Sequence, residues 1–443
     1  PPANAPDGPL VWGRDNGDDS LDIPAGQALV LTYRVVVEEA SGVLTNAVWA
    51  DWTSLAGPSP YERTGAGCPA WTAPNDYCIG PAETTVTTVD DSRFLKAIDA
   101  DSFDPADDTI ARVGDTVTFR LAPTLREGLT RDVRLQDILP AGMAFVDIVS
   151  INGDPAADYT PPGSGAGSNF SYAPITAANL PAAGQTGTLT WTIGDVVNDP
   201  FGDSSSDTLE IFYRAEILPD AGIPHVAATT LTNTASLSYT DAPPLADGAT
   251  TTVHQPVIGT VTKTDRSGRT SPAEVNVATD IMQFRLQACN SGQAPAYTLA
   301  LTDQLAVQLD ETRITEPVVA IDGAVLTAGS DYVYTPPAAR GGSLQFLLNT
   351  PVGPNQCLTI DYDIAFHTDF GPNQTWNNSA TVDEYWSLPA RSGQRYGPVG
   401  PAIFSMHNVT TIEPPDKSLV SPAAAEATIG REIVYHITVP GTG

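Results

Sequence analysis

Basic residues are scarce in this sequence. The chain of 443 residues holds 21 Lys and Arg against 52 Asp and Glu, which gives a net charge of −31. A field of that sign repels phosphate backbones and anionic lipid headgroups. The composition therefore argues against nucleic acid and membrane surfaces as partners.

The sequence also lacks long apolar runs and long stretches free of proline. No apolar run approaches the roughly 20 residues that a membrane-spanning helix needs, so we expect no membrane segment in this chain. The 39 Pro and 37 Gly recur throughout. Because proline has no amide proton and clashes with the preceding helical turn, long helices are excluded. Hydrophobic residues make up 41% of the chain, enough for packed cores, and an all-β architecture is predicted.

Motifs of turnover enzymes and of organic cofactors are missing as well. The five His are scattered without metal-ligand spacing, and no nucleophile elbow, phosphate-binding loop or dinucleotide fingerprint occurs. We therefore predict that the protein is not an enzyme and has no cofactor, except that calcium could bind an acid-rich loop. The best such loop carries Asp99, Asp101, Asp104, Asp107 and Asp108. The alternative is a solvated loop, because so acidic a chain must place its carboxylates somewhere.

Cysteine is rare too. The four residues form a close pair, Cys68 and Cys78, and a distant pair, Cys289 and Cys357. Neither pair has the spacing of a zinc knuckle, so two disulfides are predicted, the second between neighbouring strands. Disulfides persist in oxidising compartments, which indicates an extracytoplasmic protein. No signal peptide is visible and the sequence does not open with Met, so we expect Pro1 to be the start of a processed or truncated piece.

Three types of strand-like segment recur and indicate a tandem repeat. The first type is RVGDTVTFRL (112–121), VATDIMQFRL (277–286) and TIGREIVYHI (428–437). The second has a central Tyr, at Tyr33, Tyr213 and Tyr362. The third contains Asn, in LTNAVW (44–49), LTNTASL (231–237) and WNNSATV (376–382). Their order predicts half a repeat, two whole repeats and the start of another.

We place the C-terminal half of one repeat at 1–92, complete repeats at 93–258 and 259–412, and the first strands of a further repeat at 413–443. Each complete unit has short strands punctuated by Gly, Pro and Asp, which is typical of an immunoglobulin-like antiparallel β-sandwich. The junctions are β-prone and contain no Gly/Ser run, so one unit is expected to run directly into the next. The predicted fold is all-β, with tandem sandwiches forming an elongated rod.

Lysine gives the most specific signal. The chain has three, Lys96, Lys263 and Lys417, and each lies 18 to 23 residues before the repeated aromatic residue of the next strand. A solvating role would not confine lysine to one position of the repeat. Arginine cannot lose its proton in a protein whereas a buried lysine can, so this position points to amine chemistry. The alternative is an edge lysine that discourages strand pairing.

Two further polar positions repeat with the lysines: Asn46, Asn233 and Asn378 in the third segment type, and Asp137 and Asp303 after the first. Lys, Asp and Asn on three strands of one apolar core can form an intramolecular isopeptide bond. Burial lowers the pKa of the lysine, which gives a neutral nucleophile, and raises the pKa of the carboxyl group, which then polarises the carboxamide and carries a proton as ammonia leaves. This would be a single self-reaction without turnover. The alternative for Asn is a hydrogen bond to a turn backbone.

The order of a Lys strand, a GDTVTF strand, a D-x-LP turn and an N-x-A strand resembles the isopeptide-forming domains of bacterial fimbrial and adhesin proteins. It also resembles the related tandem repeats called domain of unknown function eleven in large surface proteins. The resemblance implies a Lys–Asn bond promoted by an Asp in each complete unit. The residues in these roles are Lys96, Asp137 and Asn233 in the first unit and Lys263, Asp303 and Asn378 in the second.

These observations predict a structural segment of a bacterial extracellular surface protein, such as a fimbria, filament, sheath or adhesin stalk, stiffened by isopeptide bonds and disulfides. The alternative is a set of ligand-binding adhesin repeats that recognise glycan or protein without isopeptide bonds. The expected partners are neighbouring repeats or subunits of the same protein. A head-to-tail polymer that links Lys417 of one chain to Asn46 of another is one form this could take.

Overall fold

The computed structural model describes residues 9–13, 23–35, 37, 42–55, 59–65, 77–103, 107–155, 170–198, 208–219, 223–226, 228–409, 415–421 and 428–439. By its internal packing the chain divides into two units, Pro1–Val89 and Asp90–Gly443. The described residues form β-strands and two single 3₁₀ turns, η2 (Ala177–Asn179) and η4 (Pro389–Arg391), without an α-helix. The prediction of an all-β chain is confirmed.

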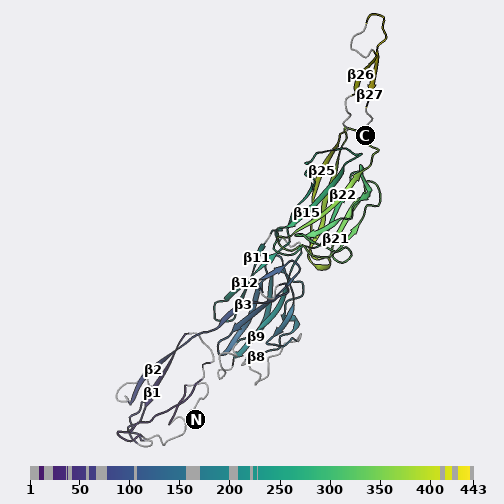
Figure 1. Cartoon of the computed structure of the whole chain (residues 1–443). Helices are drawn as coiled ribbons and strands as arrows, with labels where there is room; N and C mark the ends of the chain where they lie inside the picture. Colours follow the sequence, from purple (N-terminus) through teal and green to yellow (C-terminus); the bar gives the residue numbers. More distant parts are fainter. Residues whose placement is uncertain are drawn as a thin grey trace. The chain divides into compact units, whose positions relative to one another are not determined.

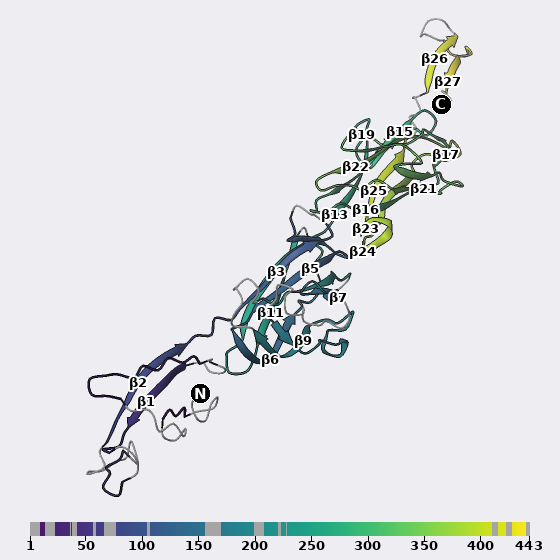
Figure 2. The same ribbon diagram turned by 90° about the horizontal axis from the view of Figure 1, so that it is seen from below.

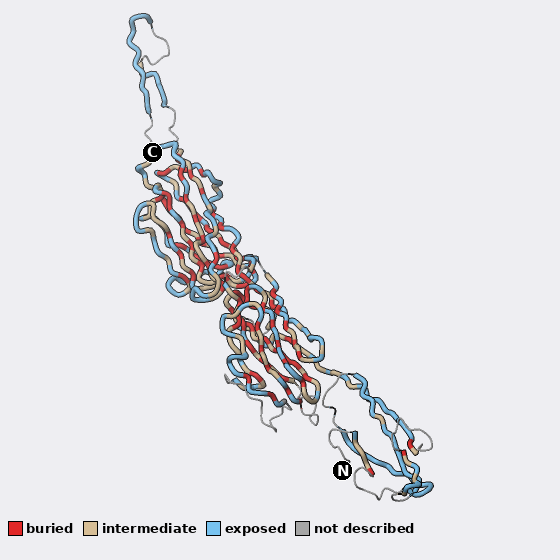
Figure 3. The backbone as a smooth tube through the Cα atoms, turned by 180° about the vertical axis from the view of Figure 1, so that it is seen from behind, coloured by how far each residue is buried: buried red, intermediate tan, exposed pale blue. Residues whose placement is uncertain are grey.

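In the described part of the first unit, β1 (Gly42–Asp51) and β2 (Cys78–Thr88) form an antiparallel hairpin. Figure 3 shows both strands as largely exposed. The same is true of the hairpin that β26 (Asp416–Ser421) and β27 (Val434–Thr438) form near the end of the second unit. Neither hairpin contributes to the two large cores of the molecule.

Two sheets pack into the first complete sandwich (Figure 1). One sheet has the strand order β3 (Arg93–Asp101), β5 (Thr116–Thr124), β10 (Ile211–Ile217) and β7 (Met143–Ile151). The other has the order β4 (Ile110–Arg112), β12 (Leu245–His254), β11 (Ala228–Ser238), β6 (Gly128–Ile138), β9 (Thr188–Asn198) and β8 (Phe170–Tyr172). All neighbours are antiparallel except β4 and β12.

The second sandwich has the same plan (Figure 2). Its first sheet has the order β13 (Ile258–Asp265), β15 (Ile281–Asn290), β22 (Cys357–Phe366), β18 (Val318–Ile321) and β19 (Ala324–Val325), with β17 (Leu309–Ile314) also paired to β22. Its second sheet has the order β14 (Ala273–Val275), β25 (Val399–Asn408), β23 (Thr375–Leu388), β16 (Tyr297–Gln304), β21 (Ser343–Leu348) and β20 (Tyr332–Thr335), with β24 (Ser392–Tyr396) paired to β23. The strand order of the first sandwich thus recurs, including one parallel pair, β14 and β25.

The alternation of apolar and polar residues explains which faces form the cores. Side chains of a strand point alternately to its two faces, so every second residue enters the core. Along β5 the fully buried residues are Val117, Phe119 and Leu121, and along β10 they are Ile211, Tyr213, Ala215 and Ile217. β15 and β22 repeat this pattern with Phe284 and Tyr362 at the centre. Both cores are therefore lined by a stacked or tilted aromatic pair from adjacent strands.

Candidate functional site

Three polar side chains meet in the core of the first sandwich. Lys96 lies on β3 in one sheet, whereas Asp137 on β6 and Asn233 on β11 lie in the other. In the register of these two strands Asp137 pairs with Ala235, two residues from Asn233, so both polar side chains point to the same side of the sheet. Lys96 is 3% exposed, and Asp137 and Asn233 are 0% exposed. Each replaces an apolar residue in a period-two strand pattern.

A fourth residue, Tyr213 on β10, contacts all three. Its hydroxyl donates to Asp137 Oδ2 (2.6 Å) and accepts hydrogen bonds from Lys96 Nζ (3.0 Å) and Asn233 Nδ2 (2.8 Å). Lys96 Nζ also donates to Asp137 Oδ2, and both of these side chains are 0% exposed. The ring of Phe119 covers the ammonium group, with its centroid 4.6 Å from Nζ. The two nitrogens and the carboxylate are thus joined through one phenol oxygen.

The second sandwich repeats this arrangement. Lys263 on β13 donates to Asp303 Oδ2 on β16, again with both side chains 0% exposed. The hydroxyl of Tyr362 on β22 donates to Asp303 Oδ2 (2.5 Å) and accepts from Lys263 Nζ (3.2 Å) and from Asn378 Nδ2 on β23 (3.4 Å). Asp303 pairs in register with the residue two positions after Asn378, as in the first sandwich. The ring centroid of Phe284 lies 4.3 Å from Nζ.

Burial dominates the electrostatics of both sites. It lowers the pKa of Lys96 and of Lys263 below their usual value, against the opposing attraction of the neighbouring carboxylate. It raises the pKa of Asp137, although the adjacent ammonium group acts in the other direction. It also raises the pKa of Tyr213 and Tyr362 well above the usual value, so both carry a hydroxyl proton at neutral pH. Burial therefore favours the neutral form of the lysine and of the tyrosine in both sites.

Each site also contains two buried oxygen atoms without a hydrogen-bond partner. They are Asp137 Oδ1 and Asn233 Oδ1 in the first sandwich and Asp303 Oδ1 and Asn378 Oδ1 in the second. An unsatisfied buried acceptor costs about 1–3 kcal/mol. A proton on the carboxyl oxygen would supply the donor that these acceptors lack. The groups present are those of an amide-forming reaction: an amine, a carboxamide and an acid.

The structure brings together all six residues that the sequence predicted for these sites, and it adds the two tyrosines. Sequence reasoning noted Tyr213 and Tyr362 as a repeated position but gave them no role. The signal that could have identified them is their recurrence at the centre of a buried strand together with Asn in the following strand. In such a strand a tyrosine hydroxyl has to find a polar partner within the core.

The third lysine and the first asparagine lie in the two hairpins. Asn46 on β1 donates through Nδ2 to the hydroxyl of Tyr33 (2.8 Å), as Asn233 does to its own tyrosine. Lys417 on β26 lies over the ring of Tyr435, with Nζ 4.1 Å from the centroid. In the part of the chain that the structure describes, neither Asn46 nor Lys417 has a carboxylate partner. In the described residues, the first hairpin therefore has the asparagine of the site and the second hairpin has the lysine, each without the carboxylate.

The predicted calcium loop remains untested. Asp101 Oδ1 accepts a hydrogen bond from the amide of Phe103, and Asp107 Oδ1 accepts two from Thr109. Asp99 lies on β3, Asp108 follows Asp107, and Asp104 lies outside the described residues. Among the described residues, the group of possible ligands that comes close together lies elsewhere: it is Asp310, Glu311 and His367, whose ligand atoms lie within 4.8 Å of one another.

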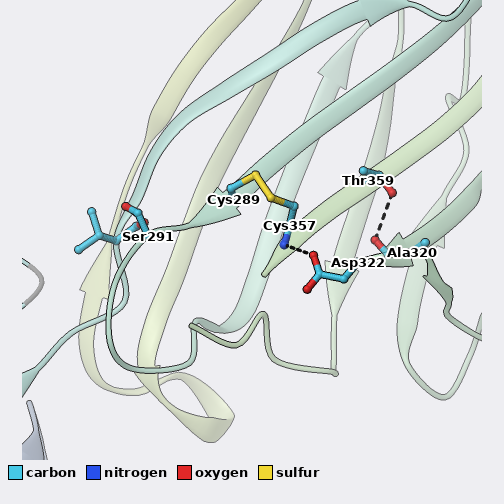
Figure 4. The surroundings of a disulfide bond; sticks show 7 residues. Cys289, Ser291, Ala320, Asp322, Cys357 and Thr359 are labelled. Carbon is cyan, nitrogen blue, oxygen red and sulfur yellow. Dashed lines mark hydrogen bonds between the residues drawn. A yellow bond between two sulfur atoms is a disulfide. The ribbon is translucent and has the colours of Figure 1, made fainter. Parts of the chain in front are cut away.

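The predicted disulfide between Cys289 and Cys357 is confirmed. It joins Cys289 near the end of β15 to Cys357 at the start of β22, a pair in register, with the two Cα atoms 4.0 Å apart (Figure 4). The amide of Cys357 donates to Asp322 Oδ1 (2.9 Å), which ties the loop after β18 to the same strand end. Cys78 is disulfide-bonded, and its predicted partner Cys68 lies outside the described residues.

None of the described helical turns is long and apolar enough to cross a membrane. The sequence matches no protein-family model and no curated protein.

The chain is similar in part to several solved structures, including three from bacteria. The C-terminal domain of the Streptococcus pyogenes antigen I/II-family protein AspA is 14% identical with a TM-score of 0.40, covering 71% of this chain and 99% of that one. The major pilin subunit BcpA of Bacillus cereus is 12% identical with a TM-score of 0.28, covering 55% and 74%. The major pilin SpaD of Corynebacterium diphtheriae is 13% identical with a TM-score of 0.28, covering 67% and 63%. Similarities of this size carry no argument about function.

Proposed function

We propose that this chain is a structural segment of a bacterial extracellular surface protein, of the fimbrial or adhesin-stalk kind. Each of its two sandwiches is stiffened by an intramolecular isopeptide bond, Lys96–Asn233 in the first and Lys263–Asn378 in the second. The observation that carries the proposal is the fully buried set of Lys, Asp and Asn on three strands, present with the same contacts in both sandwiches. The disulfide between Cys289 and Cys357 is in keeping with an oxidising compartment outside the cytoplasm.

The reaction starts with a proton transfer within the ion pair. Lys96 gives one proton to Asp137, which leaves a neutral amine beside a carboxylic acid, the form that a dry site favours. Nζ then attacks Cγ of Asn233 while the acid polarises the carboxamide oxygen. A bond forms between Nζ and Cγ, the bond between Cγ and Nδ2 breaks, and one ammonia leaves. Lys263, Asp303 and Asn378 follow the same steps in the second sandwich.

The bonds would stabilise the folded chain mainly by restricting the unfolded one. Each closes a long loop, of 137 residues between Lys96 and Asn233 and of 115 residues between Lys263 and Asn378. With the chain-entropy relation used for disulfides, a loop of this length contributes about 5 kcal/mol. That is comparable to the whole free energy of unfolding of a small domain.

The intact mass of the reduced chain tests the proposal. Each bond expels one ammonia, about 17 Da, so the chain should be lighter than its sequence by two ammonias. Peptide mapping should then find Lys96 joined to Asn233 and Lys263 joined to Asn378. An unshifted mass would refute the isopeptide bonds and favour the ligand-binding adhesin as the function of these sandwiches.

Two substitutions test the role of the acids. Asp137→Ala and Asp303→Ala should each abolish the bond of their own sandwich and leave the other bond intact. Asp147→Ala is the matched control, because Asp147 lies in the first sandwich in an exposed ion pair with Arg214. Unchanged bond formation in both acid variants would reject the assignment of the acids.

A further inference from the structure

We infer that the hydroxyls of Tyr213 and Tyr362 are catalytic in this reaction, each carrying a proton from the lysine nitrogen to the departing amide nitrogen. The inference rests on the proposed function and adds a reactive group to it. Its basis is geometric: in both sandwiches one phenol oxygen lies within hydrogen-bond distance of the nitrogen that attacks and of the nitrogen that leaves.

The hydrogen-bond capacity of the hydroxyl is fully used. A phenol offers one donor and two acceptor sites. Tyr213 directs its proton to Asp137 Oδ2, and its oxygen accepts from Lys96 Nζ and from Asn233 Nδ2. A tyrosine that served packing alone would need one partner for its hydroxyl. This one contacts every polar group of the site, and Tyr362 does the same.

The reaction has to move one proton from the attacking nitrogen to the departing nitrogen, a step that the sequence-based hypothesis gave to the acid. After Nζ attacks Cγ, that nitrogen carries one proton too many, while Nδ2 needs a third proton to leave as ammonia. Direct transfer between two nitrogens on one carbon passes through a strained four-membered ring. In the relay the phenol oxygen takes the proton of Nζ as the phenol gives its own proton to Nδ2. Tyrosine is regenerated, Asp137 stays a carboxylic acid, and the products are one amide and one ammonia.

Apart from Asp137, whose proton polarises the carboxamide oxygen, the surroundings leave few other proton carriers. Tyr213 and Phe119 are both 0% exposed, and their rings stack with centroids 5.5 Å apart beside Lys96 Nζ. Bulk water is thereby excluded from the nitrogen. Burial also keeps the pKa of Tyr213 well above its usual value, so the hydroxyl retains the proton that the relay must give.

Removing the hydroxyl alone tests the inference. Full-length wild type and Tyr213→Phe would be made by cell-free translation, sampled over time and analysed by intact mass and peptide mapping. General acid–base groups contribute at least about 10²-fold in rate, so formation of the Lys96–Asn233 bond should slow by about 10²-fold. The Lys263–Asn378 bond of the same molecules should form at the wild-type rate, and Tyr362→Phe should reverse the pattern.

A matched control separates chemistry from folding. Tyr239→Phe removes another buried hydroxyl from the first sandwich, one that donates to Asp90 (2.9 Å), and should leave the rate unchanged. Melting temperatures of the two variants, each with Asn233→Ala to prevent the bond, show whether they are equally folded. A Tyr213→Phe chain that forms the bond at the wild-type rate overturns the inference while the proposed function stands. A wild-type chain without ammonia loss overturns the proposed function itself. Equal slowing in Tyr239→Phe would make the effect one of stability and also overturn the inference.

Discussion

Lys96 Nζ and Asp137 Oδ2 form an ion pair between the two sheets of the first sandwich, and neither side chain is exposed to solvent. Burying two opposite charges costs the hydration of both, and their attraction repays this only in part. Transfer of one proton removes both charges at once. The burial that would destabilise a permanent ion pair therefore favours the neutral amine that forms an isopeptide bond.

Replacing one lysine should remove one bond. In Lys96→Met the mass deficit should fall from two ammonias to one, and the free energy of unfolding of the first sandwich should fall by about 5 kcal/mol, because the 137-residue loop is no longer closed. Intact mass and denaturant unfolding measure the two effects. Lys417→Met is the control and should change neither. A deficit of two ammonias in Lys96→Met would contradict the assignment.

The same variant should show a dependence of stability on pH. Before the bond forms, burial raises the pKa of Asp137 from its ordinary 3.8, and the Lys96 ammonium group opposes this rise. Without Lys96 the folded-state pKa should rise further, so the folded chain binds a proton that the unfolded chain releases. Stability is then fully present below about pH 3.8 and is lost as pH rises through the folded-state pKa, by up to about 1.4 kcal/mol per pH unit.

Melting curves of Lys96→Met between pH 4 and 8 measure this dependence. The double variant Lys96→Met/Asp137→Leu removes the carboxyl group and should be nearly flat over the same range. If the melting temperature of Lys96→Met instead rises with pH, the folded-state pKa of Asp137 lies below its unfolded value and the prediction is wrong.

The disulfide should matter less when the isopeptide bond is present. Cys289 and Cys357 lie inside the loop that the Lys263–Asn378 bond would close, so their separation in the unfolded chain is already restricted. Cys289→Ala/Cys357→Ala should therefore cost roughly 1 kcal/mol less in the wild type than in a Lys263→Met background. Denaturant unfolding of the four chains measures this as a double-mutant cycle. Equal costs in both backgrounds would indicate that no covalent loop surrounds the disulfide.

Lys417 should remain unmodified. Its amine lies over Tyr435 and has no carboxylate partner in the described part of the hairpin, so the acid step is missing. Peptide mapping should recover Lys417 in a linear peptide, and denaturing electrophoresis should give a single monomer band. A ladder of multimers joined through Lys417 and Asn46 would instead establish the head-to-tail polymer that the sequence raises as an alternative.

The sequence was informative where a rare residue recurred. With three lysines in the whole chain, their repeated position singled out Lys96 and Lys263, and the sequence predicted that Asp137 and Asn233 share a core with Lys96. The structure adds that β6 and β11 place Asp137 and Asn233 on the same face of one sheet. The all-β fold followed from the same alternation and from the density of proline. The placement of the repeats, the rod and the calcium loop stay predictions.

The tyrosines were not assigned a role because their role depends on long-range geometry. Tyr213 at the centre of a period-two strand has the pattern of an ordinary core aromatic residue. Its contacts come from β3, β6 and β11, which are separated by up to 117 residues along the chain from it. No local pattern states which polar group a buried hydroxyl will meet. The Asp and Asn partners of each lysine can be predicted from the repeats. The tyrosine oxygen that connects these three side chains can be identified only in the folded core.

The position of the bonds along the chain would also set how a pulling force travels. Tension that enters at β3 would cross to β11 through the Lys96–Asn233 bond and bypass every strand between them. The tension would leave the first sandwich through the 30 residues from Asn233 to Lys263, which include β12. It would then cross the second sandwich through the Lys263–Asn378 bond. The 30-residue connection could lengthen to about 100 Å at most. Under load the two aromatic cores and the disulfide between Cys289 and Cys357 would lie off the line of tension, and the chain would resist by its covalent bonds alone.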